Sequence, residues 1–117
     1  MPPTPDPSGA VFGALADPTR RALLQALADG PDRTATELAV RFPISRQAVV
    51  KHLGTLSDAG LLSRERAGRE VRYRFDPEPL SEAVLWMAQM GAEWDERLAG
   101  LRERFAPAPS QQRGMPR

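Results

Sequence analysis

The stretch SRQAVVKHLGTLSDAGLLSRERAGREVRYRF, residues 45–75, begins with a helical pattern and changes directly into an alternating one. Val49, Leu53 and Leu56 recur at the spacing of one helix face, which predicts that this face is buried. Ser45 is a favourable N-cap residue, so we expect the helix to begin there with its unpaired N–H groups exposed. The opposite face of the helix is then available to an external partner.

After Gly60 the sequence alternates as in two antiparallel strands, and Ala67 and Gly68 are expected to form the turn between them. The first strand carries Leu62, Arg64 and Arg66 at alternate positions, and on the second Val71, Tyr73 and Phe75 alternate with Glu70, Arg72 and Arg74. A helix followed by a basic hairpin is typical of a winged helix-turn-helix, in which the helix enters a DNA major groove and the hairpin lies along the neighbouring backbone. The stretch therefore predicts binding of duplex DNA.

Three helices are expected before residue 45. The first covers about residues 9–16, and the second is capped by Asp17 and ends at Gly30. The third covers about 37–42, with Thr36 as its cap, and one or two extended residues are expected just before it. Pro43 ends the third helix, so a tight turn leads to Ser45, which gives the two-helix geometry of a helix-turn-helix. The residues expected in the core of these helices are Leu23, Leu24, Leu27, Leu38 and Phe42.

A long helix is predicted from 79 to 105, with apolar residues recurring at helical spacing. It has more apolar surface than so small a domain can cover, and a second copy of the chain could cover the excess. We therefore expect a homodimer joined by the first and last helices, although Trp86 and Trp94 could instead line a ligand pocket. The expected interface residues are Val11, Phe12, Leu15, Val84, Met87, Trp94, Leu98 and Leu101. The predicted fold class is mainly α with a small β-hairpin wing (α+β), built from five helices.

Length and composition indicate one domain, at 10–106, between proline-rich segments at 1–9 and 107–117 that we expect to be disordered. The chain has no cysteine, which excludes a disulfide or a thiolate metal site. Neither a signal peptide nor an apolar run of about 18 residues is present, so a cytoplasmic location without membrane contact is expected.

Charge is distributed unevenly along the chain. The formal net charge is only +1, yet residues 44–75 carry seven basic side chains against three acidic ones, and residues 77–105 carry three against six. Such a separation attracts a polyanion to one part of the molecule and repels it from the other.

The segments LADPTRRALLQALADG (15–30), TELA (36–39), SRQAVVKHLGTLSDAGLL (45–62) and the hairpin ending in VRYRF resemble the ArsR family of bacterial winged-helix repressors. The resemblance covers about residues 10–104. It implies a homodimer that binds a near-palindromic operator close to its own promoter and releases it on a signal. The effector, whether a small molecule or a protein, is not specified by the sequence.

Metal sensing is not expected. Family members that sense arsenite, cadmium or lead have two cysteines at the places that match Thr34 and Thr36, and zinc or nickel sensors have histidines on the last helix. The only histidine of the sequence is His52. It matches one that family members commonly have in the helix that enters the major groove. The chain resembles instead a cysteine-free subgroup often encoded beside START-like lipid-binding proteins. No cofactor is expected, and no catalytic constellation is evident that would make the chain an enzyme.

Nine residues are the candidates for contact with DNA. Arg46 can bridge guanine O6 and N7, Gln47 can pair with adenine, and Val50 either touches a thymine methyl or packs inside the fold. Arg69 is expected near the tip of the hairpin, beside a phosphate or minor groove, while some of the wing arginines could be plain surface. The full set is Ser45, Arg46, Gln47, Val50, Lys51, Arg64, Arg66, Arg69 and Arg72. The alternative is a protein-interaction module that keeps the winged scaffold and binds a partner through the long helix.

Overall fold

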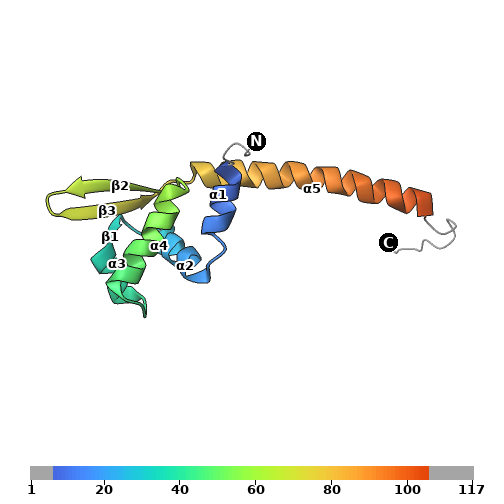
Figure 1. Cartoon of the computed structure of the whole chain (residues 1–117). Coiled ribbons are helices and arrows are strands. Elements are labelled where there is room, and N and C mark those ends of the chain that lie inside the picture. The colour runs from blue at the N-terminus through green and yellow to red at the C-terminus, as the bar shows by residue number, and fades with distance from the viewer. Residues whose placement is uncertain (1–6, 106–117) are drawn as a thin grey trace, which may run out of the picture. The chain divides into compact units, whose positions relative to one another are not determined.

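The computed structural model describes residues 7–105 and contains five helices and a small antiparallel sheet (Figure 1). This agrees with the predicted fold class. The elements in chain order are α1 (Pro7–Ala14), α2 (Pro18–Asp29), β1 (Arg33–Thr34), α3 (Ala35–Arg41), α4 (Arg46–Asp58), β2 (Leu62–Ala67), β3 (Glu70–Phe75) and α5 (Glu78–Phe105).

The starts of α2 and α4 follow the predicted capping residues. The Asp17 carboxylate accepts hydrogen bonds from the backbone N–H groups of Thr19, at 2.7 Å, and Arg20, at 3.2 Å. Ser45 Oγ accepts one from the N–H of Ala48 at 3.1 Å. Each cap satisfies N–H groups that have no partner within the helix, which fixes where the helix begins.

The cap of α3 is Thr34, and the prediction of Thr36 was wrong. Thr34 Oγ1 accepts from the N–H of Glu37 at 3.1 Å, and Glu37 Oε1 accepts from the N–H of Thr34 at 2.9 Å. This reciprocal capping box satisfies two backbone donors at once, so the helix begins at Ala35, two residues earlier than expected, and Thr36 lies inside it.

The sheet has the strand order β1-β3-β2, with both pairs antiparallel. The short β1, which matches the extended residues expected before α3, pairs Arg33 with Tyr73. Ala67 still pairs with Glu70 at the end of β2, so the turn of the hairpin consists of Gly68 and Arg69 and not of Ala67 and Gly68. Gly68 has φ +65°, a conformation that favours glycine.

The core lies where α1 to α4 and the start of α5 meet the sheet. All three apolar residues that define the buried face of α4, Val49, Leu53 and Leu56, are fully buried, as predicted. Phe42 is only partly buried against this core. The other buried apolar residues are Val11, Ala14, Leu23, Leu24, Leu27, Ala35, Leu38, Leu61, Leu62, Tyr73 and Ala83.

Val11 was expected at a dimer interface, and its position corrects that expectation. It is 0% exposed within the single chain, where α1 contacts α4. A side chain that one protomer already buries completely has no surface left for a second, so Val11 belongs to the core. Phe12 and Leu15, from the same predicted set, are partly buried.

The chain divides into two compact units after Val84. The helical residues from Leu85 to Phe105, taken by themselves, present exposed apolar side chains, and the Arg97 guanidinium lies 5.2 Å from the centre of the Trp94 ring. No helix within residues 7–105 is long and apolar enough to span a membrane.

Both segments that were expected to be disordered lie outside the described residues, apart from 7–9, which are helical. The first helix therefore begins earlier than predicted, at Pro7, and ends at Ala14.

Candidate nucleic-acid interface

The outer face of α4 begins with a group of exposed polar side chains. Ser45, Arg46, Gln47 and Lys51 are all exposed, while Val50 is 39% exposed at the edge of the buried face. The turn before them is short, because the N–H of Ile44 donates to the carbonyl of Phe42 at 2.8 Å. The helix therefore presents its N-terminus, with the positive end of its dipole, beside these side chains.

Arg46 is held by a residue of the preceding helix. Its Nε donates a hydrogen bond to Thr36 Oγ1 at 2.9 Å, across the turn between α3 and α4. Both side chains are exposed. This contact joins residues ten positions apart and was not expected from the sequence, in which Thr36 was predicted to cap α3.

The register of the hairpin sorts the wing arginines onto two faces of the sheet. Arg64 pairs with Tyr73 and Arg66 with Val71, and paired residues of antiparallel strands project to the same face. Arg72 and Arg74 alternate with these positions and therefore lie on the other face. Arg69 is in the turn, and with Arg64 and Arg66 it is exposed.

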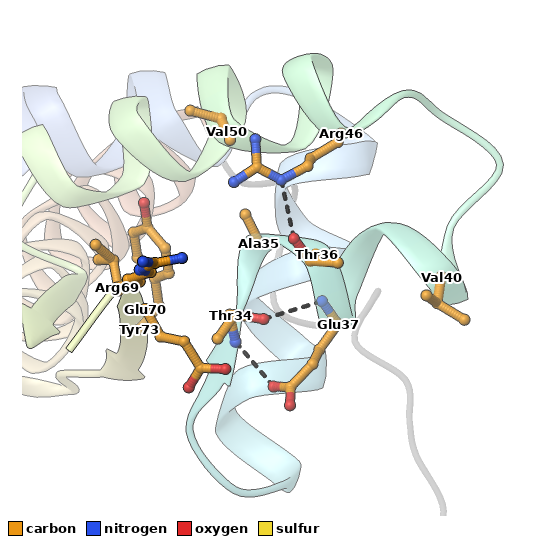
Figure 2. Close-up of a pocket in the computed structure, with 11 residues that line it drawn as sticks. Thr34, Ala35, Thr36, Glu37, Val40, Arg46, Val50, Arg69, Glu70 and Tyr73 are labelled. Atoms are coloured by element: carbon orange, nitrogen blue, oxygen red, sulfur yellow. Dashed lines mark hydrogen bonds between the residues drawn. The ribbon is translucent and has the colours of Figure 1, made fainter. Parts of the chain in front are cut away.

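A surface hollow joins the wing to the helix-turn-helix. Figure 2 shows Arg46 reaching from α4 toward Thr36 on α3, with Val50 farther along α4 and Arg69 and Tyr73 on the opposite wall. Val40, at the other end of α3, is 83% exposed and was not singled out from the sequence. The structure thus brings the predicted residues Arg46, Val50 and Arg69 together around one hollow.

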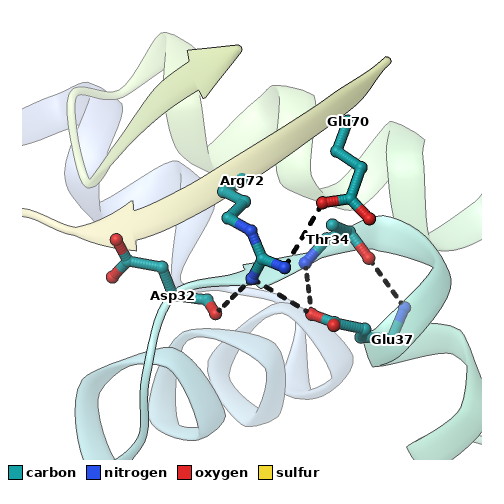
Figure 3. Close-up of polar contacts among 5 residues, drawn as sticks. All are labelled: Asp32, Thr34, Glu37, Glu70 and Arg72. Atoms are coloured by element: carbon teal, nitrogen blue, oxygen red, sulfur yellow. Dashed lines mark hydrogen bonds and ion pairs between the residues drawn. The ribbon is translucent and has the colours of Figure 1, made fainter. Parts of the chain in front are cut away.

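Arg72 is different from the other predicted contacts, because its guanidinium is bonded within the protein (Figure 3). Nη1 donates to the carbonyl oxygen of Asp32 at 3.1 Å and lies 3.6 Å from Glu37 Oε1, and Nη2 donates to Glu70 Oε1 at 3.3 Å. Glu37 Oε1 is the same oxygen that caps α3 through Thr34. Arg72 therefore connects β3 to the start of α3 and, of the wing arginines predicted to contact DNA, is the one bonded within the protein.

Acidic partners are found on only one side of the wing. Every ion pair within residues 7–105 involves Arg72 or Arg74, the latter with Asp32 and Glu65, each at 3.6 Å. In the same range, Arg64, Arg66, Arg69 and Lys51 have no carboxylate partner. On the wing, the arginines without a carboxylate partner are Arg64 and Arg66, which share a face with the hollow, and Arg69, in the hairpin turn.

Arg20, at the start of α2, connects the end of α1 to α4. Arg20 donates from Nε to the carbonyl of Ala14 at 2.7 Å, and its Nη1 lies 3.5 Å from His52 Nδ1. The backbone N–H of Arg20 is the main cause that lowers the pKa of Asp17 below its usual value, aided by the N–H of Thr19 and opposed by desolvation. His52 thus contacts α2 within its own chain.

The second predicted surface, on α5, remains exposed in the single chain. Its members Val84, Met87, Trp94, Leu98 and Leu101 are each between 43% and 53% exposed. Leu85 and Trp86 add to the exposed apolar area.

Comparison with known proteins agrees with this geometry. A family model described as a helix-turn-helix domain matches residues 15–65. The structure is similar to an ArsR-like transcriptional regulator from Rhodococcus sp. RHA1, with a TM-score of 0.77 and 40% sequence identity, covering 85% of this chain and 92% of that one. The chain belongs to the ArsR family. It is a winged helix-turn-helix transcriptional regulator.

Two relatives of known sequence fall in the same group. The transcriptional repressor SdpR of Bacillus subtilis (strain 168) is 38% identical over 77 residues, which are 66% of this chain and 84% of the relative. A probable mercury resistance operon repressor of Streptomyces lividans is 36% identical over 89 residues, 76% of this chain and 70% of the relative. This ArsR chain has no cysteine.

Proposed function

We propose that this ArsR-family chain is a repressor that binds duplex DNA as a homodimer, at a near-palindromic operator close to its own promoter. The observation that carries the proposal is the separation of charges on the wing. The wing cations without acidic partners, Arg64, Arg66 and Arg69, accompany the exposed face of α4, while Arg72 and Arg74 form ion pairs with carboxylates. A surface of unpaired cations around a protruding helix is suited to phosphates.

In this proposal α4 enters the major groove by its N-terminus. Arg46 and Gln47 meet base edges, Ser45 and Lys51 contact the backbone, and Val50 reaches a thymine methyl group. Arg69 and the two arginines of β2 follow the neighbouring sugar-phosphate backbone. Arg72 is left out of the proposed contacts, because Nη1 and Nη2 each already donate within the protein, to Asp32 and Glu70, and Nη1 also lies near Glu37.

The dimer is proposed from the exposed apolar face of α5. Helical residues from Leu85 to Leu101 expose two tryptophans and several aliphatic side chains at helical spacing. Large exposed apolar patches on small proteins usually mark an interaction surface. Two copies that pair through this face would present two recognition helices to half-sites about one helical turn, or 34 Å, apart.

Electrophoretic mobility shift on the DNA upstream of the gene, titrated with salt, tests the proposal. We expect a complex that weakens steeply with salt and a length-matched scrambled duplex that competes poorly. The same exposed face of α5 also favours a second candidate function, a protein-interaction module without DNA binding. Absence of any complex at low salt would refute the repressor and favour this second function.

A further inference from the structure

The hydrogen bond between Arg46 and Thr36 restricts how this arginine can meet a base. A guanidinium has five N–H donors and no acceptor, arranged in a rigid plane. Two edges of this plane can each present two parallel N–H donors. The side edge presents Nε–H with one N–H of the adjacent Nη, and the end edge presents one N–H each from Nη1 and Nη2. Nε donates to Thr36 Oγ1 at 2.9 Å, so the side edge is engaged within the protein.

The end edge is unoccupied. Within residues 7–105 neither Nη1 nor Nη2 of Arg46 has a hydrogen-bond or ion-pair partner, and the side chain is exposed. Thr36 approaches from α3, so it constrains the guanidinium from outside the helix that carries Arg46 (Figure 2). Two parallel donors match the O6 and N7 acceptors of guanine in the major groove.

We infer that Thr36 is a positioning residue that aims the end edge of Arg46 at a guanine in each half-site. The inference rests on the proposed binding of duplex DNA and adds the base that is recognised and the residue that orients its reader. The family resemblance matched Thr36 only to a place where metal-sensing relatives have a cysteine, and the sequence spacing predicted only that it caps α3. Its actual position, exposed and inside α3, leaves its hydroxyl available to Arg46.

The contact should act on base preference more than on overall affinity. Without the acceptor on Thr36, Arg46 keeps its charge and still attracts phosphates, but its guanidinium rotates freely among several rotamers. The Arg46 side chain must then become ordered during binding. This entropic cost weakens its bidentate contact with guanine more than a non-specific contact with phosphate. A phosphate-contacting Arg46 would show the opposite pattern, in which salt dependence changes and base preference does not.

In the test, the full-length protein binds duplexes from a pool in which the central positions are randomised. Each duplex has about 30 base pairs, which is long enough for two half-sites one helical turn apart. Sequencing of bound DNA gives the preference at each position for wild type and for Arg46→Ala, Thr36→Val and Thr36→Ser. Thr36→Val keeps the shape of the side chain and removes the acceptor, while Thr36→Ser restores it. Thr55→Val is the matched control, because within residues 7–105 the hydrogen bond of Thr55 Oγ1 is to the carbonyl of Lys51 in its own helix.

We expect Arg46→Ala to reduce the preference for guanine at one position per half-site by about 5- to 150-fold. Thr36→Val should reduce it at the same position by about two- to tenfold, with Thr36→Ser and Thr55→Val close to wild type. The inference is overturned if Thr36→Val leaves that preference unchanged, or if Arg46→Ala changes only the salt dependence. Failure of wild type to enrich or retain any duplex at low salt would refute the proposed function itself.

Discussion

The separation of wing arginines into paired and unpaired sets leads to a contrast between two substitutions on one hairpin. Arg69→Ala removes an exposed cation from the turn, and Arg72→Gln removes one that is bonded to Asp32, Glu37 and Glu70. Both variants lose the same charge. Only the first should lose a phosphate contact.

The magnitude follows from counterion release. Each phosphate that a cation neutralises contributes about 0.9 to the slope of log affinity against log salt concentration. Arg69→Ala should therefore lower the slope by about 0.9 per subunit, or about 1.8 for a dimer on two half-sites. Arg72→Gln should leave the slope unchanged and reduce affinity at every salt concentration, because β3 loses its connection to the start of α3.

The assay is fluorescence anisotropy of a labelled duplex taken from the selection described above, titrated at several salt concentrations. Arg102→Ala, on the acidic part of α5, controls for the loss of one positive charge, and thermal unfolding of each variant checks that it remains folded. Equal slopes for Arg69→Ala and wild type would refute the assignment of Arg69. A slope for Arg72→Gln reduced as much as that of Arg69→Ala would show that the internal bonds of Arg72 do not keep it from DNA.

Three further predictions concern assembly and stability. Trp94→Glu places a charge on an apolar face that is 50% exposed at that residue, so light scattering should detect monomers or aggregates, and an unchanged tight dimer would contradict the proposed interface. Leu53→Ala leaves a cavity at a fully buried position and should reduce the free energy of unfolding by about 2–5 kcal/mol in urea titration, whereas a loss as small as that of an exposed substitution would contradict the core described above. The pKa of Asp17 is lowered in the folded chain, chiefly by the N–H of Arg20, so its stabilising effect is complete above the unfolded value of 3.8 and is lost as pH falls through the folded pKa. Asp17→Asn keeps a capping side chain without the titration, so its unfolding free energy should depend less on pH in that acidic range, and identical profiles would exclude the effect.

Local patterns predicted the recognition helix and its hairpin well. The buried residues of α4 follow from helical spacing, the caps Asp17 and Ser45 from residue type, and the strands from alternation, because each depends on neighbours in the sequence. The cap of α3 could also have been predicted, because Thr34 and Glu37 have the spacing of a capping box, but Thr36 was predicted instead.

The roles of Thr36 and Arg72 depend on contacts between segments that only the fold brings together. Arg72 meets the carbonyl of a residue forty positions away, and its neighbour Glu70 gives no sign of that from the sequence. The alternation of the sequence predicted two strands, but the register that puts Arg64 and Arg72 on opposite faces, and the acidic partners of Arg72, came from the structure. Val11 was misassigned for a related reason, because an apolar residue at a helix surface looks the same whether its own chain or a second copy covers it.

The most direct test of the account is to map the DNA-binding surface by nuclear magnetic resonance, titrating the protein with the selected duplex. We predict that the largest changes in backbone amide shifts occur at residues 45–51 and at the hairpin turn, and that the Nε–H signals of Arg64, Arg66 and Arg69 change while that of Arg72 changes little. Changes centred on other helices, with α4 and the hairpin turn unaffected, would contradict the claim that α4 and its unpaired wing cations form the DNA-binding surface.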